Sequence, residues 1–313
     1  MKTARFAVIA MAVLAVTLWG LESVQRARDD AKFPPPGHFV ELGDRRLHVQ
    51  CAGTSNGVTV MLEAGAGASS LDWEVVASKL SERLRVCRYD RAGHGWSDQG
   101  PKPRSIEAIT LDLHRVIEEE AQANAIVLAG HSFGGLIAQA YARQHPDRLL
   151  GLVLVDAVDA EFIELYAEQS IAGARTMKVG SVVTHFGLPR LLGIAPAPES
   201  APADVQAAMK ARVIRPVNIA TVADESVSVR ANVEYLAVLG PIKGDLPITV
   251  VSRSTDPTIA FDRDWEAAQV RMSRLNGRTK RVVSSSTDHQ LGFTDPDLVV
   301  SKILALTDDA AEQ

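Results

Sequence analysis

Hydrophobic residues recur along the chain from residue 39 onward in short runs that polar and glycine-containing turns separate. The runs that predict strands cover residues 39–42, 45–52, 58–63, 84–89, 125–129, 149–155, 248–252 and 281–284. The first two flank Gly43-Asp44 and predict a hairpin. Runs 125–129 and 149–155 are apolar throughout, which is typical of parallel strands buried on both faces.

Segments with helical periodicity alternate with these strands. They are predicted over 73–80, after Ser105, over 136–143, over 264–272 and over 297–306. Ser105 can cap its helix, and apolar residues at 106, 109, 113, 116 and 117 share one face. Alternation of this kind predicts an α/β fold whose mostly parallel sheet is covered on both faces by helices.

The alternation stops between residues 158 and 239. This stretch is helix-prone but interrupted by Gly187-Leu188-Pro189 and by an alanine- and proline-rich segment at 195–198. We therefore predict a helical cap over 158–239, inserted into an α/β core made of residues 38–157 and 240–308.

The N-terminus carries an apolar run over residues 6–21, preceded by Lys2 and Arg5. As a helix it would be about 24 Å long, against a hydrocarbon core of roughly 30 Å. We predict a signal-anchor or signal peptide over 1–21, with a cytosolic structural helix as the third interpretation. The charged residues 22–32 and Pro34-Pro35-Pro36 then predict a tether over 22–37.

The short basic head favours a membrane-anchored protein whose globular part is extracytoplasmic, or a secreted or periplasmic protein if the segment is cleaved. With 46% hydrophobic residues, 313 residues can bury one sizeable core. The formal net charge of -5 argues against a nucleic-acid binder. No metal-ligand spacing or dinucleotide motif is recognisable, so no metal or cofactor is implied, and the oligomeric state is left open.

Gly130-His131-Ser132-Phe133-Gly134 fits the pattern G-x-S-x-G, with an apolar strand before it and a helical segment after it. A serine at a tight strand-to-helix turn needs small residues two positions to either side, and the two glycines meet that need. We predict Ser132 as a nucleophile, against the simpler interpretation of a serine that merely caps a helix.

Two further motifs accompany this one: the glycine-rich turn 65–67 after strand 58–63, and Asp90-Arg91-Ala92-Gly93-His94-Gly95-Trp96-Ser97. With them, residues 39–306 resemble the α/β-hydrolase superfamily. The resemblance implies an eight-stranded, mostly parallel sheet flanked by helices, with an inserted helical cap. It also implies a triad in the chain order serine, acid, histidine.

The late residues His289 and Asp256 fit the family's base and acid. A serine hydroxyl is a poor nucleophile without a neighbouring base, and the acid would orient that base. Asp256 follows strand 248–252, where the family usually places the acid; Asp156, after strand 149–155, is the main rival, and Asp262 and Asp264 are weaker ones.

The same resemblance implies an oxyanion hole made of the backbone N–H groups of Ala66 and Phe133. Many relatives carry His-Gly in the first of these loops, where this chain has Ala64-Gly65. A backbone contribution survives that change, but a side chain that often braces the loop is lost.

Cys51 and Cys87 are the only cysteines of the chain. In the family fold their two strands are neighbours, which implies a disulfide if the protein is exported. The alternative is a pair of small buried hydrophobic residues.

Taken together, the sequence predicts a serine hydrolase that cleaves a carboxylic ester or related small-molecule acyl substrate through an acyl-enzyme, with a membrane contact through residues 6–21. A serine rather than an aspartate at the turn argues against dehalogenase and epoxide hydrolase chemistry. Acyltransferase, peptidase and lactonase activities share the triad and stay open, as does a non-catalytic binding protein with a hydrolase fold.

Overall fold

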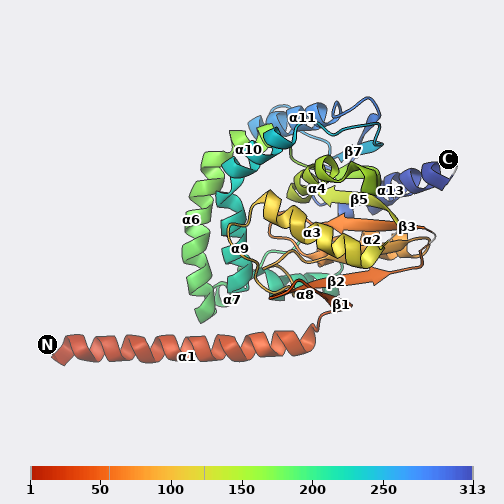
Figure 1. Cartoon of the computed structure of the whole chain (residues 1–313). Helices are drawn as coiled ribbons and strands as arrows, with labels where there is room; N and C mark the ends of the chain where they lie inside the picture. Colours follow the sequence, from red (N-terminus) through yellow and green to blue (C-terminus); the bar gives the residue numbers. More distant parts are fainter. Residues whose placement is uncertain (1, 56, 123, 312–313) are drawn as a thin grey trace.

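An eight-stranded sheet forms the centre of the molecule (Figure 1). The computed structural model describes residues 2–55, 57–122 and 124–311. Met1 of the predicted N-terminal segment, and Asn56 and Ala123 of the predicted core, lie outside these ranges. The strands are β1 (His38–Glu41), β2 (Arg46–Ala52), β3 (Val58–Glu63), β4 (Arg85–Tyr89), β5 (Ala125–His131), β6 (Leu149–Val155), β7 (Ile248–Ser252) and β8 (Thr279–Val283).

The strand order is β1-β2-β4-β3-β5-β6-β7-β8. Strand β2 pairs antiparallel with both β1 and β4, and every pairing from β4 to β8 is parallel. The predicted fold class, a mostly parallel eight-stranded α/β sheet, is confirmed. Parallel pairing brings the carboxyl ends of β3, β5, β6 and β7 to one edge of the sheet, where the loops that follow them meet.

Helices cover both faces of the sheet. Alternate residues of β5 point to opposite layers, with Leu128 in one apolar cluster and Val127 in the other. The first layer contains α3 (Ile106–Ala121), α4 (Phe133–Gln144) and α11 (Ala260–Met272); the second contains α2 (Glu74–Ser81) and α13 (Pro296–Ala311). The Ser105 side chain accepts a hydrogen bond from the Ala108 N–H and caps α3, as predicted.

The chain between β6 and β7 is helical. It contains α5 (Ala160–Leu165), α6 (Ala167–Val183), α7 (Leu188–Leu191), α8 (Ala203–Val213), α9 (Pro216–Val227) and α10 (Val229–Leu239), which we call the cap helices. Helices α6 and α9 pack side by side over the edge of the sheet (Figure 1). The 3-10 turn Thr184–Phe186 follows α6 and ends at Gly187. The φ of +71° at Gly187 is accessible to glycine without steric cost.

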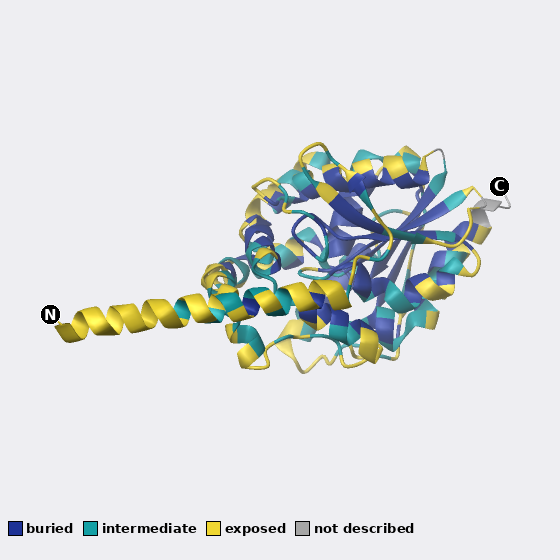
Figure 2. Cartoon of the chain, turned by 90° about the horizontal axis from the view of Figure 1, so that it is seen from below, coloured by how far each residue is buried: buried dark blue, intermediate teal, exposed yellow. Residues whose placement is uncertain are grey.

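The N-terminal helix α1 runs without a break from Lys2 to Lys32. Its first half projects from the body and is exposed, whereas its second half lies against the body (Figure 2). By length and composition alone, α1 is able to cross a membrane. The predicted tether over 22–37 is wrong as far as Lys32, because residues 22–32 continue α1 and lie against the body. Glu22 and Asp29 are only 5% and 7% exposed, and Arg190 of cap helix α7 binds both, an interaction that sequence spacing cannot reveal.

Strands β2 and β4 are neighbours, and their register places Cys51 opposite Cys87. The two sulfur atoms are joined as a disulfide, with an S–S distance of 2.00 Å. The two strands are adjacent in the sheet, as expected, and the predicted pairing of the cysteines depended on this.

Candidate active site

Ser132 lies at the sharp turn between β5 and α4. Its φ of 53° and ψ of -120° are rarely adopted by residues other than glycine, and such a conformation costs about 1–3 kcal/mol. The turn is possible because its neighbours lack side chains. A Cβ added to Gly130 would lie 2.4 Å from the Gly134 carbonyl oxygen, and one added to Gly134 would lie 2.4 Å from the Ala64 carbonyl oxygen. The strained turn presents the Ser132 hydroxyl to the pocket described below.

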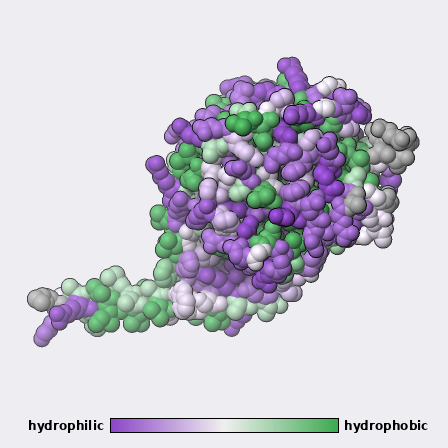
Figure 3. Space-filling model, in the orientation of Figure 1, coloured by the Kyte–Doolittle hydropathy of each residue, from purple (hydrophilic) through white to green (hydrophobic). Residues whose placement is uncertain are grey.

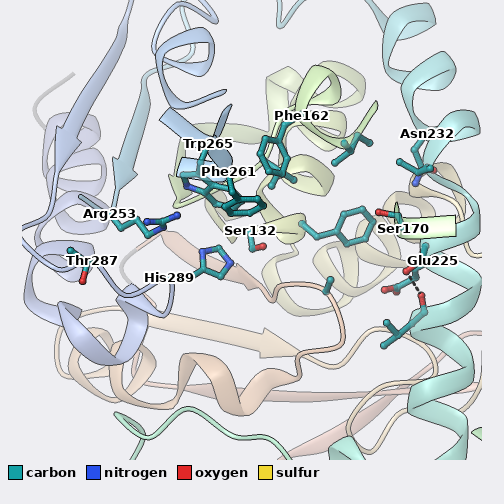
Figure 4. Close-up of a pocket in the computed structure, with 17 residues that line it drawn as sticks. Ser132, Phe162, Ser170, Glu225, Asn232, Arg253, Phe261, Trp265, Thr287 and His289 are labelled. Atoms are coloured by element: carbon teal, nitrogen blue, oxygen red, sulfur yellow. Dashed lines mark hydrogen bonds between the residues drawn. The ribbon is translucent and has the colours of Figure 1, made fainter. Parts of the chain in front are cut away.

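His289 follows β8 and lines the same pocket as Ser132, in agreement with the sequence prediction. The two side chains lie next to each other in Figure 4. His131 holds the backbone at His289 in place. The Nε2 atom of the His131 ring is hydrogen-bonded to the His289 carbonyl oxygen at 2.9 Å. Burial, together with the nearby His289, lowers the pKa of His131 to about 3, so its ring stays neutral at ordinary pH and can donate this bond.

The carboxylate that bonds His289 belongs to Asp156. His289 Nδ1 and Asp156 Oδ2 are 2.6 Å apart, and Asp156 is fully buried. Its other oxygen, Oδ1, accepts bonds from the Trp265 Nε1–H at 2.9 Å and the Arg253 N–H at 3.1 Å. Asp156 directly follows β6 and has a φ of 40°. These contacts hold one carboxylate oxygen in place and leave the other directed at the imidazole.

The expectation that Asp256 contacts His289 is wrong. Asp256 is exposed, and its carboxylate accepts bonds from the Thr258 N–H and hydroxyl at 2.8 and 2.7 Å. These two bonds lower its pKa below the usual value. Strand β7 already ends at Ser252, so Asp256 lies in the turn before α11, away from the sheet edge. The sequence feature that could have identified Asp156 was its position directly after the apolar run 149–155.

Ala66 and Phe133 line the same pocket as Ser132. Ala66 lies in the loop after β3, and Phe133 is the first residue of α4. In the turns and loops that the structure describes, neither backbone N–H donates to a carbonyl oxygen. Both groups are thus available to an oxygen bound near Ser132.

Arg91 holds the loop that contains Ala66, a role that the sequence did not indicate. Its guanidinium donates to the carbonyl oxygens of Ala64 at 2.6 Å and Gly65 at 2.7 Å. An arginine thus braces the loop that lacks the family's histidine. The one sequence feature that pointed to Arg91 was its position in the motif 90–97.

The guanidinium of Arg91 is itself held by two carboxylates, at 2.7 Å from Glu63 and 3.2 Å from Glu225. Glu225 comes from cap helix α9 and also contacts His94 Nε2 at 3.0 Å. Burial would raise the pKa of Glu225, but the attraction of Arg91 and His94 outweighs it and lowers the pKa to about 2. Glu225 is therefore ionised, and an ion pair links the cap to the loop beside Ser132.

The pocket is a cavity of about 590 Å³ between the sheet edge and the cap helices (Figure 4). Its walls are mainly apolar, formed by Phe133, Val158, Phe162, Val222, Phe261 and Trp265 among others. Ser170, Glu225 and Asn232 lie at the side away from His289. A cavity of this size and lining suits a small organic substrate with an apolar part.

One group of potential metal ligands occurs in the described part of the chain: Cys51, Cys87 and Glu120. Its two sulfur atoms are consumed by the disulfide, and the group lies outside the pocket.

The fold, the turn at Ser132 and the contact of His289 with the buried Asp156 are features of α/β hydrolases. The family model for the alpha/beta hydrolase fold matches residues 58–269, and the chain belongs to this family. Among curated proteins, an Azorhizobium caulinodans protein named "Putative carbamate hydrolase RutD" is 34% identical over 118 residues, which are 38% of this chain and 43% of that protein. The chain thus matches less than half the length of this relative.

Two solved structures have the same fold. The enol-lactonase from Burkholderia xenovorans LB400 has a TM-score of 0.65 at 20% identity, covering 87% of this chain and 100% of that one. A thermophilic esterase from Thermogutta terrifontis has a TM-score of 0.63 at 24% identity, covering 86% of this chain and 96% of that one. At these identities the likeness extends to the fold alone.

Proposed function

We propose that this α/β hydrolase is a serine hydrolase that cleaves a carboxylic ester or related acyl substrate through an acyl-enzyme. The observation that carries the proposal is geometric. Ser132, on its strained turn, shares one pocket with His289, and the buried Asp156 binds the far nitrogen of that imidazole at 2.6 Å. Nucleophile, base and orienting acid are the three groups that serine acyl transfer requires.

In the proposed reaction, His289 Nε2 accepts the Ser132 hydroxyl proton as the oxygen attacks the substrate carbonyl carbon. The backbone N–H groups of Ala66 and Phe133 bind the resulting oxyanion; one such donor is typically worth about 3–4 kcal/mol in the transition state. His289 then protonates the leaving alcohol. In the second half, His289 deprotonates a water molecule, which attacks the acyl carbon. The imidazolium then returns this proton to the Ser132 oxygen as the bond between that oxygen and the acyl carbon breaks, which releases the acid and restores the Ser132 hydroxyl. Asp156 stabilises the imidazolium throughout.

The pocket supports an ester with an apolar acyl or leaving group. Aromatic and branched side chains dominate its walls, and its volume of about 590 Å³ accommodates a substrate of drug-like size. The named activities of the structural relatives, an esterase and an enol-lactonase, belong to the same chemical class.

We further propose that the protein is exported and held at a membrane by residues 6–21 of α1. The apolar half of this helix is exposed, which is unfavourable in water and favourable in lipid. A disulfide between Cys51 and Cys87 fits an oxidising compartment.

The proposal is tested with a fluorophosphonate label and a panel of p-nitrophenyl esters of increasing chain length. Wild type is expected to be labelled and to hydrolyse some of the esters, and Ser132→Ala to do neither. Ser301→Ala, which removes an exposed hydroxyl on α13, is the matched control and is expected to behave as wild type. Labelling of Ser132→Ala at the wild-type rate would refute the proposal. Product analysis with added alcohols and with lactone substrates separates hydrolase from acyltransferase and lactonase activity.

A further inference from the structure

The cap carries an exposed apolar segment next to α1, in α7 and the turn after it. We call it the apolar ridge; its members are Leu188, Leu191, Leu192 and Ile194, which are 40%, 77%, 61% and 58% exposed. Four neighbouring large apolar side chains at this exposure are costly in water and mark a contact surface. The 3-10 turn 184–186 just before α7 packs on α1, and Arg190 of α7 reaches two α1 carboxylates.

The ridge is held at one level along α1 by part-buried ion pairs. Arg190, within the ridge, binds Glu22 at 3.1 Å and Asp29 at 2.8 Å. Glu22 is the residue directly after the apolar run 6–21, and its carboxylate also packs on Gly187, where an added Cβ would lie 2.9 Å from Oε2. The ridge therefore stands where the apolar run ends.

A second set of ion pairs prevents α1 from turning away. Asp30 binds Arg212 at 2.9 Å and Arg215 at 2.7 Å, on α8 and just before α9. The Phe33 carbonyl oxygen accepts further bonds from Arg212 and from Trp96 Nε1. The second half of α1 is thus part of the folded body, and α1 and the cap helices have one fixed orientation.

These observations point to a partner of definite chemistry. The exposed first half of α1 presents mostly hydrophobic side chains in Figure 3, and the ridge lies at the end of this apolar run. We propose that the ridge inserts into the interface of the phospholipid bilayer that holds residues 6–21, so that the cap rests on the membrane. This inference depends on the proposed membrane insertion of α1.

Length supports the same arrangement. The apolar run is about 24 Å long, roughly 6 Å shorter than the hydrocarbon core. A short span draws its flanking parts toward the bilayer. The ridge lies at that end of the span, and its side chains are suited to the apolar side of the interface.

The experiment uses the full-length protein in phosphatidylcholine vesicles with single environment-sensitive fluorophores. Because the two native cysteines form a disulfide, one added cysteine is labelled selectively. The positions are Leu191→Cys in the ridge, Val13→Cys in the apolar half of α1, and Ser301→Cys on α13 as an exposed control. The readout is quenching by spin-labelled lipid. We expect strong quenching at positions 13 and 191 and little at 301.

The outcomes separate the two hypotheses. Quenching at 13 with the signal at 191 no higher than at 301 would overturn the ridge insertion and keep the anchor. Absence of quenching at 13 would overturn the anchor itself. A fluorophore at 191 that is shielded from water but not quenched by lipid would indicate a protein contact instead, and would also overturn the inference.

A matched variant tests the ion pairs. Glu22→Gln, Asp29→Asn and Asp30→Asn together remove the carboxylates of α1 and keep the shape of its side chains. We expect quenching at position 191 to fall to the level of position 301, while position 13 stays quenched and esterase activity with a soluble ester stays at the wild-type level. Undiminished quenching at 191 in this variant would refute the fixed orientation.

Discussion

Asp156 and Asp256 differ by their surroundings rather than by their chemistry. Asp156 is fully buried, receives bonds from Trp265 and from the Arg253 backbone, and faces His289. Asp256 is exposed and bonds Thr258 within its own turn. A carboxylate can orient an imidazole only when its own oxygens are held, and the burial of Asp156 also strengthens the interaction with an imidazolium.

We expect Asp156→Asn to lower kcat by about 10⁴-fold, because an amide cannot stabilise the imidazolium and favours the wrong tautomer of His289. Asp256→Asn is the matched control and is expected to stay within twofold of wild type. Steady-state kinetics with a p-nitrophenyl ester measure both variants. The opposite ranking would show that the Asp156–His289 contact is not the one used in catalysis.

At the scale of elements, Arg91 joins three parts of the fold. It binds Glu63 at the end of β3, the carbonyl oxygens of the following loop, and Glu225 on cap helix α9. The loop between β3 and α2 contains Ala66, whose N–H is a proposed oxyanion donor. A movement of α9 would therefore displace the loop through Arg91. Arg91 acts as a positioning residue for the Ala66 N–H.

We expect Arg91→Lys to lower kcat by about 10–100-fold with a smaller change in KM. A lysine keeps the charge but cannot donate to both carbonyl oxygens at once, and losing such a bond costs about 1–3 kcal/mol. Arg88→Lys is the matched control: Arg88 is also buried and bonds Gln50, Glu74 and the Ser70 carbonyl oxygen, but not the carbonyl oxygens of Ala64 and Gly65. A loss of kcat in Arg88→Lys equal to that in Arg91→Lys would indicate a general loss of stability instead.

At the scale of the whole molecule, acid weakens the fold through groups around the active site. His131 has a pKa lowered to about 3 by burial, so the unfolded chain takes up a proton on this residue between pH 6.5 and 3 while the folded chain does not. The free energy of unfolding is therefore not reduced by His131 above pH 6.5, and it decreases as the pH falls from 6.5 toward 3. Glu225, with a pKa lowered to about 2, loses its contribution only between pH 4.5 and 2.

We expect wild type to lose about 2 kcal/mol more unfolding free energy between pH 7 and pH 5 than His131→Asn does, because asparagine has no proton to gain. Urea unfolding at the two pH values measures the difference. The variant is expected to be less stable at pH 7, since it alters the bond to the His289 carbonyl oxygen. An equal pH dependence in both proteins would show that His131 does not titrate with the lowered pKa.

Local pattern was enough to predict the sheet, its helices and several site positions. Short hydrophobic runs indicated the strands, and the glycines around Ser132 indicated the turn, because each depends on residues close in sequence. The structure brings Ser132, His289, Ala66 and Phe133 to one pocket, as expected.

Tertiary structure alone decided which acid meets His289, what braces the oxyanion loop, and whether residues 22–32 are a tether. Asp156 and His289 are 133 positions apart, Arg91 and Glu225 are 134, and Glu22 and Arg190 are 168. The sequence offered several carboxylates and arginines of equal chemistry. Only the packing of strands and helices selects which of them are buried together, and burial is what makes one ionic contact worth more than another.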